Sequence, residues 1–218
     1  MLQTLQRTAT DFSVETLSPS RQEALLALCA GDSLPLLPPD ALRPALEAGR
    51  ILGDFSGTDT LQAAAALLPL YDDATLPASL RAAGYGADGQ GAVLTPPRTL
   101  PHYTRLRQFL RTALGLATAR YASYHVWAVQ PLDPERLPDC EDLCAQYLSA
   151  GLTLRGVRPM AGSELLIFSA RGLPHWREPY RRLHLGDPAL PRMLERGYAV
   201  GDFGWGAGGM ELILRKAT

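Results

Sequence analysis

Apolar and polar positions in the first third of the chain follow periods that predict strands and helices in turn. Residues 12–17 alternate between apolar and polar and predict a strand, and residues 19–30 carry an apolar stripe at helical spacing. A second, short helix is expected over residues 40–48. Residues 50–55 and 60–70 are apolar runs joined by a Gly-containing turn, which indicates a hairpin. The pattern therefore predicts a strand, two helices and a hairpin, in that order.

The pattern of the middle third predicts a second set of elements. After an irregular stretch, residues 92–95 form a short apolar run ended by two prolines, which indicates a strand. Apolar residues from Leu106 to Ala117 recur every three or four positions and predict the clearest amphipathic helix in the chain. Residues 124–129 predict a strand, and residues 131–138 are expected to form a loop.

The stretch that follows predicts a helix and then a hairpin. Asp139 is placed to cap the helix, and Gly151 is placed to end it in the left-handed conformation that favours glycine. Leu152, Leu154 and Val157 predict one strand, Ala161-Gly162 the turn, and the apolar residues 165–168 the antiparallel return strand. The chain as a whole is therefore expected to be mixed α/β.

The end of this helix carries a recognisable spacing. Tyr147 lies four residues before Gly151, and the apolar Leu152 follows directly. This arrangement resembles the Tyr-x-x-x-Gly-Phe end of the last core helix in the GNAT (Gcn5-related N-acetyltransferase) superfamily. The order of expected elements over residues 10–170 is similar to that of a GNAT domain. The resemblance implies a mixed central sheet flanked by helices, and transfer of an acyl group from acetyl-CoA or another acyl-CoA to the amine of a small molecule or peptide.

The resemblance also implies where the site lies. Tyr147 is the implied general acid, since a phenol has an ordinary pKa near 10 and a leaving thiolate has one near 8.5. Backbone N–H groups in the strand before the long helix would bind the thioester carbonyl, and the loop after that strand would hold the cofactor pyrophosphate. The implied cofactor-binding residues are Val93, Leu94, Thr95, Arg98, Thr99, His102, Tyr103, Thr104 and Arg105.

That loop departs from the family pattern. GNAT proteins carry Gln/Arg-x-x-Gly-x-Gly/Ala there, whereas residues 96–105 of this chain contain three prolines and no glycine. Prolines remove N–H donors, and the lack of glycine limits close approach of a phosphate to the backbone. Two hypotheses follow. The chain is either an N-acyltransferase with an altered cofactor loop, or a GNAT-fold module that binds a ligand or protein without catalysis.

The tail repeats features of the motif, since residues 193–198 predict another helix end, at Gly197, and residues 211–214 predict another strand. Gly197, Gly208 and Leu212-Ile213 lie 46 positions after Gly151, Gly162 and Leu166-Ile167 (197 − 151 = 46). The repetition arises either from a duplication of a strand-helix-hairpin unit or from chance. We expect an acyltransferase core over residues 1–170 and a C-terminal extension over residues 171–218 that packs on or extends the same sheet.

Composition narrows the class of protein. The net charge of −1 provides no field to attract nucleic acid or an anionic membrane, so neither is an expected partner. Three cysteines are too few for a disulfide framework, and the first residues lack the apolar core of a signal peptide, so we expect a cytoplasmic protein. Cys140 and Cys144 lie one helical turn apart, but no second pair or nearby histidine completes a metal site, so no metal is expected. The oligomeric state stays open.

Overall fold

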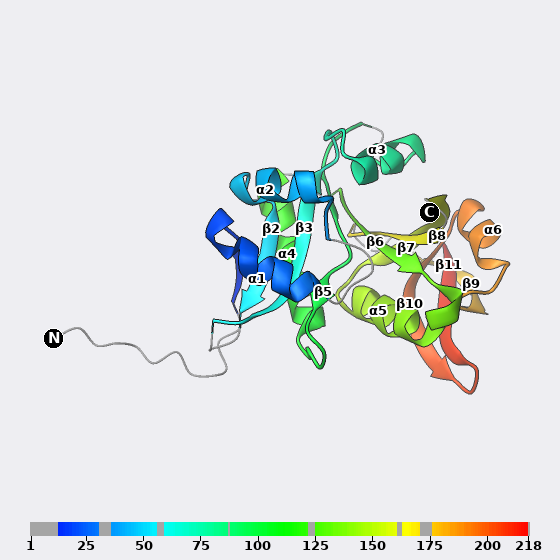
Figure 1. Ribbon diagram of the computed structural model, residues 1–218. Helices are drawn as coiled ribbons and strands as arrows, with labels where there is room; N and C mark the ends of the chain where they lie inside the picture. The colour runs from blue at the N-terminus through cyan, green and yellow to red at the C-terminus, as the bar shows by residue number, and fades with distance from the viewer. Residues whose placement is uncertain are drawn as a thin grey trace. The chain divides into compact units, whose positions relative to one another are not determined.

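The computed structural model describes residues 13–30, 36–55, 59–86, 88–121, 125–160, 163–170 and 176–217. The chain divides into two compact units, whose helices and strands are labelled in Figure 1. The first comprises Met1–Leu67 and Pro97–Ala113, and the second comprises Leu68–Pro96 and Leu114–Thr218. Both units contain helices and strands, so the mixed α/β class expected from the sequence is confirmed.

The first unit is built on an antiparallel sheet with the strand order β1-β2-β3-β5. Its strands are β1 (Val14–Thr16), β2 (Ile51–Phe55), β3 (Leu61–Pro69) and β5 (Arg98–Thr99). Its helices are α1 (Gln22–Cys29), preceded by the 3-10 turn η1 (Pro19–Arg21), and α2 (Pro39–Glu47). Residues 63–66 of β3 are all alanine and fully buried, so neighbouring side chains pack closely on both faces of the strand. The predicted hairpin of β2 and β3 is confirmed.

The second unit is built on a larger sheet with the order β4-β6-β8-β7-β10-β11-β9. Its strands are β4 (Ala92–Leu94), β6 (Val126–Leu132), β7 (Thr153–Met160), β8 (Ser163–Ser169), β9 (Trp176–His184), β10 (Tyr198–Gly206) and β11 (Gly209–Ala217). Its helices are α3 (Thr75–Ala82), α5 (Leu137–Ser149) and α6 (Leu190–Glu195). The long helix α4 (Leu106–Tyr121) begins in the first unit and ends in the second. The β4–β6 pair is parallel, and the other pairs of this sheet are antiparallel.

The connection before α5 differs from the predicted loop over residues 131–138. Strand β6 continues through Leu132, the turn η2 (Pro134–Arg136) follows, and α5 begins at Leu137. The buried Leu132 side chain keeps the strand going, and Pro131 is accommodated opposite Leu165 of β8. The side chain of Asp133 accepts a hydrogen bond from the Glu135 amide at 3.0 Å and so starts the turn. The prolines therefore lie in regular elements, not in an open loop.

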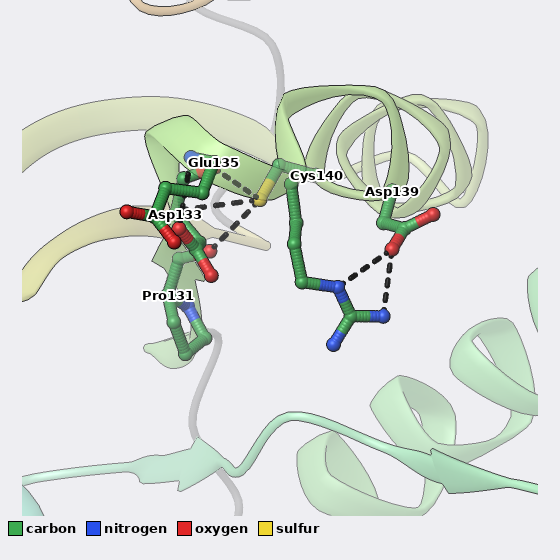
Figure 2. A network of polar contacts seen from close by, with 6 residues as sticks. Pro131, Asp133, Glu135, Asp139 and Cys140 are labelled. Carbon is green, nitrogen blue, oxygen red and sulfur yellow. Dashed lines mark hydrogen bonds and ion pairs between the residues drawn. The ribbon is translucent and has the colours of Figure 1, made fainter.

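The predicted helix cap at Asp139 is also wrong. The α5 N-cap position is Arg136, and Asp139 lies within the first turn, where its carboxylate accepts hydrogen bonds from the Arg136 guanidinium at 2.9 and 2.7 Å (Figure 2). Figure 2 also shows Cys140 on the other side of this turn, where its thiol lies among the backbone groups of Pro131 and Asp133. The amide of Asp133 donates to Cys140 Sγ at 3.3 Å. Hydrogen bonds between the Cys140 thiol and the backbone of Pro131 and Asp133 fix the start of α5, and Asp139 does not cap it.

The tail strands join the sheet of the second unit. Strand β10 pairs with β7 through Val200 and Leu154, and β11 and β9 follow in order. The sequence predicted the helix end at Gly197 and the strand over residues 211–214, and both are present. The functional division into a core over residues 1–170 and an extension over 171–218 stays a prediction. Within the described ranges, no helix is both long enough and apolar enough to cross a bilayer.

Candidate functional site

The parallel strands β4 and β6 part after a short ladder. Ala92, Val93 and Leu94 pair with residues 126–128, and β4 ends there while β6 runs on to Leu132. All three β4 residues are fully buried, and Thr95, which follows them, is 3% exposed. From Val129 onward β6 therefore has β8 on one side and no β4 residue on the other. Parallel strands in α/β proteins present their carboxyl ends to ligands at such a point.

Tyr147 reaches β6 at the position where the two strands part. Its side chain is fully buried, and its hydroxyl donates a hydrogen bond to the carbonyl oxygen of Val129 at 3.2 Å. Val129 follows Ala128, the residue paired with Leu94 at the end of the β4 ladder. The ring stacks on Phe168 of β8 with centroids 4.8 Å apart and planes 22° apart. The structure thus connects the end of β4 and the predicted acid Tyr147 through one residue of β6.

The Tyr-x-x-x-Gly spacing has a structural explanation of its own. Gly151 has φ +97° and follows the last turn of α5, where the amides of Ala150 and Gly151 bond to carbonyls of the preceding turn. The amide of Leu152 donates to the carbonyl oxygen of Tyr147 at 3.1 Å. This is the hydrogen-bond pattern by which glycine ends a helix. The spacing that suggested the family is therefore also required for ending α5 here.

The predicted cofactor loop is anchored to the first unit by its backbone. Arg98 and Thr99 form β5 and pair with Ala64 and Ala63 of β3. His102 has φ +67°, which a non-glycine residue adopts only in tight turns. The amide of Tyr103 donates to Leu100 O at 3.2 Å. Sequence reasoning missed β5, because a strand of two residues after two prolines has no periodicity to detect.

Asp54 is the polar residue of this region that sequence reasoning did not single out. It lies in β2, is fully buried, and accepts a hydrogen bond from the Tyr103 hydroxyl at 2.6 Å on Oδ2. The guanidinium of Arg105 lies 3.2 Å from the same oxygen. Burial, and then the hydrogen bond to Asp54, raises the pKa of the Tyr103 phenol. The available signal was an aspartate in the otherwise apolar strand Ile-Leu-Gly-Asp-Phe, because a buried carboxylate needs partners.

The predicted site residues fall in both units. Val93, Leu94, Thr95 and Tyr147 belong to the second, and Arg98, Thr99, His102, Tyr103, Thr104 and Arg105 belong to the first. Within the second unit, the β4 residues and Tyr147 meet at β6. Within the first, Tyr103 and Arg105 meet at Asp54, while His102 and Thr104 are exposed. The predicted site residues therefore form two local arrangements, one around Tyr147 and one around Asp54.

The cysteines of α5 are packed in the core. Burial is the largest cause of the raised pKa of both the Cys140 and the Cys144 thiols. Neither thiol is therefore activated as a nucleophile, which requires a lowered pKa. Among the described residues, no group of three His, Cys, Asp or Glu side chains is arranged to hold a metal ion.

Solved structures resemble this chain in fold. A GNAT-family acetyltransferase from Bacillus cereus aligns with a TM-score of 0.52 at 10% identity, covering 75% of this chain and 99% of that one. The chain has the GNAT fold. A second GNAT-family acetyltransferase, from Listeria monocytogenes, aligns with a TM-score of 0.49 at 13% identity, covering 73% of this chain and 96% of that one. No family model matches the sequence, and no curated protein is significantly similar to it.

Proposed function

We propose that this protein transfers an acetyl group from acetyl-CoA to the amine of a small molecule or peptide. The observation that carries the proposal is the position of Tyr147, within a GNAT fold, at the residue of β6 where β4 ends. A phenol that can donate a proton lies there beside the carboxyl end of a short buried strand. These are the two parts that direct acyl transfer from a thioester needs, namely an acid and backbone donors for an oxyanion.

In the proposed reaction, the neutral amine nitrogen attacks the thioester carbonyl carbon and forms the C–N bond. The carbonyl oxygen gains negative charge, which the backbone N–H groups at Val93 and Leu94 stabilise. The C–S bond then breaks, its electron pair passes to sulfur, and the Tyr147 hydroxyl gives its proton to the thiolate. The amine releases one proton to solvent, and the Tyr147 phenolate takes one back from solvent, so the charges balance and the acid is restored. For this step the Tyr147 O–H turns from Val129 O toward the sulfur.

The residues present fit the acyl end of acetyl-CoA better than its pyrophosphate. Burial of β4 and the Tyr147 hydroxyl beside the end of its ladder support the assignment of the acyl end to this place. In the loop, Asp54 already holds the Tyr103 hydroxyl and Arg105, and the Tyr103 amide donates to Leu100 O. Arg98, Thr99, His102 and Thr104 stay the predicted pyrophosphate-binding residues, and we assign Tyr103 and Arg105 to holding the loop in place.

A second function is favoured by one observation. Asp54 contacts Tyr103 and Arg105, so two polar side chains of the predicted cofactor loop bind within the protein. A loop held in this way suits a GNAT-fold module that binds a ligand or protein partner and performs no chemistry. The two functions differ in one measurable property, the turnover of acetyl-CoA.

The first experiment measures the melting temperature with and without acetyl-CoA. A ligand present at about 100 times its Kd stabilises the folded state by about 2.7 kcal/mol. We expect a rise with acetyl-CoA, and a smaller rise for Arg98→Ala than for the matched control Arg43→Ala, an exposed arginine that pairs with Glu47 on α2. Release of free thiol in the presence of a panel of amines then measures turnover.

Three outcomes separate the two functions. A rise in melting temperature together with thiol release supports the N-acetyltransferase. A rise without thiol release for any amine favours the binding module. An unchanged melting temperature at millimolar acetyl-CoA contradicts the acetyl-CoA proposal.

A further inference from the structure

The second unit contains the same supersecondary structure twice. The first copy is β6-α5-β7-β8, and the second is β9-α6-β10-β11. Residue pairs of the β7–β8 hairpin map onto those of β10–β11 with the offset of 46 seen in the sequence. Leu154–Phe168 corresponds to Val200–Leu214, and the irregularity after Leu154 corresponds to the one after Val200. A chance echo would not reproduce the register of a whole hairpin.

The other elements of the two copies correspond as well. Val129 of β6 lies opposite Ile167, and Arg182 of β9 lies opposite Ile213, so the first strands are offset by 53. The second copy is thus seven residues shorter between its first strand and its hairpin. This equals the difference in length between α5, with 13 residues, and α6, with 6. The copies join through β7 and β10, where Leu154 faces its own counterpart Val200. Such a self-paired contact is what a local two-fold axis produces.

The second copy carries a cavity beside the counterpart of Tyr147. A cavity of about 720 Å³ is lined by Arg181, Arg182, Leu183, Ala189, Met193, Arg196, Tyr198 and Lys216. Met193 is the counterpart of Tyr147, by the offset of 46. In the first copy, the Tyr147 ring is fully buried and stacks on Phe168. In the second copy, the methionine lines the cavity.

Three cations of the cavity replace alanines of the first copy. Arg181, Arg196 and Lys216 are the counterparts of Ala128, Ala150 and Ala170. Lys216 is the sole lysine of the chain. These three come from β9, the end of α6 and β11. Cations gathered in one hollow repel one another, so their presence together is best explained by an anion that binds between them.

Three cations of this cavity have no ion-pair partner among the described side chains. No described carboxylate lies within ion-pair distance of Arg181, Arg196 or Lys216. Arg182 is the exception in the lining, since it lies 3.4 Å from Glu211 Oε2. The acid of α6, Glu195, binds Arg158 at 2.8 Å instead. An outside anion would therefore find three cations that no described carboxylate neutralises.

We propose that this cavity binds a small molecule that carries one or more phosphate groups. The forked donors of two arginines and the point charge of Lys216 suit phosphate oxygens. Leu183, Met193 and Tyr198 supply an apolar wall for the remainder of the molecule. The size is in the range of pockets for small ligands. With a methionine in place of Tyr147, the second copy binds without the acid that the first copy offers.

This site is separate from the region around Tyr147. In the sheet order, β11 lies three strand spacings from β8, on which the Tyr147 ring stacks, or about 14 Å at roughly 4.8 Å each. Binding there is independent of the acyl transfer proposed above. The duplicated unit thus presents one buried tyrosine and one basic cavity at equivalent positions.

The test measures binding of inorganic pyrophosphate to the full chain by calorimetry at low ionic strength. Two variants restore the residue of the first copy, Arg196→Ala and Lys216→Ala. The matched control is Arg192→Ala, an exposed arginine of α6 that is not part of the cavity lining. We expect each restoring variant to weaken pyrophosphate binding about tenfold or more, and the control to leave it within about twofold. Citrate, a polycarboxylate, is titrated in parallel.

The outcomes are distinct. Because all three positions are exposed, the variants should fold, and melting temperatures equal to or above that of the parent protein confirm it. Pyrophosphate binding that the restoring variants reduce and the control does not supports the proposal. Absence of binding overturns it, and so does binding that all variants share, which places the anion elsewhere. Citrate bound as tightly as pyrophosphate overturns the assignment to phosphate.

Discussion

The Tyr147 hydroxyl donates its hydrogen bond to the Val129 carbonyl, one residue beyond the last pair of the β4–β6 ladder. This contact joins the end of α5 to the strand that β4 leaves. It gives Tyr147 two roles that can be measured apart. One is a packing role, through a buried ring stacked on Phe168, and the other is a chemical role, through a hydroxyl at the proposed site of acyl transfer.

The first prediction separates these roles with Tyr147→Phe. The ring and its stacking are kept, so removing the hydroxyl should lower the free energy of unfolding by only about 1 kcal/mol, from the lost bond to Val129 O. We expect kcat for acetyl transfer to fall at least about tenfold, because protonation of a leaving group contributes roughly 10²–10⁴-fold in enzymes. The affinity for acetyl-CoA should change little. Urea unfolding, thiol release and titration calorimetry measure these three quantities in turn.

The control for this prediction is Tyr85→Phe, which removes the hydroxyl of another tyrosine of the second unit. Tyr85 packs edge-on against Trp127, and its hydroxyl lies against Gly156 of β7. Its turnover should match that of the parent protein. An unchanged kcat in Tyr147→Phe would assign the residue to packing alone.

The second prediction concerns the carboxylate of Asp54. Asp54→Asn removes the negative charge that holds Arg105 and weakens the acceptor for the Tyr103 hydroxyl. We expect the free energy of unfolding to fall by about 1–3 kcal/mol, the usual cost of disturbing a buried, charge-assisted hydrogen bond. Urea unfolding measures it. The matched control is Asp59→Asn, since Asp59 pairs with Arg21 at an exposed site and asparagine tolerates its φ of +61°. Equal losses in both variants would contradict the role given to Asp54.

The third prediction follows from the phenol of Tyr103. Its pKa in the folded state is raised, first by burial and then by the bond to Asp54, whereas the unfolded phenol has a pKa near 10. A raised pKa means that the protonated form is favoured by folding. The stabilisation is therefore complete below pH ~10 and is lost as the pH rises above that value. The free energy of unfolding should fall more steeply above pH ~10 in the parent protein than in Tyr103→Phe.

The loss of stability above pH ~10 has a second source, which is present both in the parent protein and in Tyr103→Phe. The pKa of Tyr85 is also raised, chiefly by burial, and Tyr103→Phe does not alter it. The variant should therefore flatten the fall without abolishing it. Identical pH profiles for the two proteins would show that Tyr103 is as accessible in the folded state as in the unfolded one.

Much of the fold was accessible from the sequence because its signals are local. Gly151 and Gly197 ended their helices as predicted, and the apolar run after Leu106 formed α4. The offset of 46 residues was visible in the glycines, although only the strand register distinguishes a duplication from chance. Pro131 and Asp139 were assigned wrongly because a proline and a capping residue look the same in a loop as in a strand end or a first helical turn.

The candidate site was less accessible because its contacts are long-range. Asp54 lies 49 residues from Tyr103 in the chain, and nothing at either position points to the other. The cavity residues Arg181 and Lys216 are also on different strands, and their relation depends on the register of β9 with β11. Sequence periodicity places a residue on a strand or helix but does not give its partner.

The fourth prediction concerns the three thiols. Burial raises the pKa of Cys144 and of Cys140, so neither should react with a thiol reagent in the folded protein near pH 8. Cys29 is only half-buried at the end of α1. We expect one thiol to react rapidly in native protein and three in denaturant, with the rapid reaction absent in Cys29→Ser. Rapid native labelling of a second thiol would mean that α5 opens readily, which would conflict with its packing in the core.

The fifth prediction concerns Gly91, the residue that lets β4 lie against β6. Gly91 has φ +98°, and a Cβ there would collide with the backbone carbonyl of His125, which itself accepts a hydrogen bond from the Ala92 amide at 3.1 Å. Neither the His125 carbonyl nor the backbone at Gly91 can move away without breaking the start of the β4–β6 ladder. Gly84 has a similar φ of +85° with open space around its Cβ position, so it provides a matched control.

Alanine at either glycine costs roughly 1–2 kcal/mol for the left-handed backbone alone. Gly91→Ala adds the collision, and overpacking costs a further 1–3 kcal/mol or so. We therefore expect Gly91→Ala to lower the free energy of unfolding clearly more than Gly84→Ala, as measured by urea unfolding. Because β4 presents Val93 and Leu94 to the proposed acyl site, Gly91→Ala should also weaken acetyl-CoA binding at a temperature where the variant is still folded. Equal stability of the two variants would show that β4 can shift away from β6 at no cost, and the backbone donors at Val93 and Leu94 would then not be fixed relative to Tyr147.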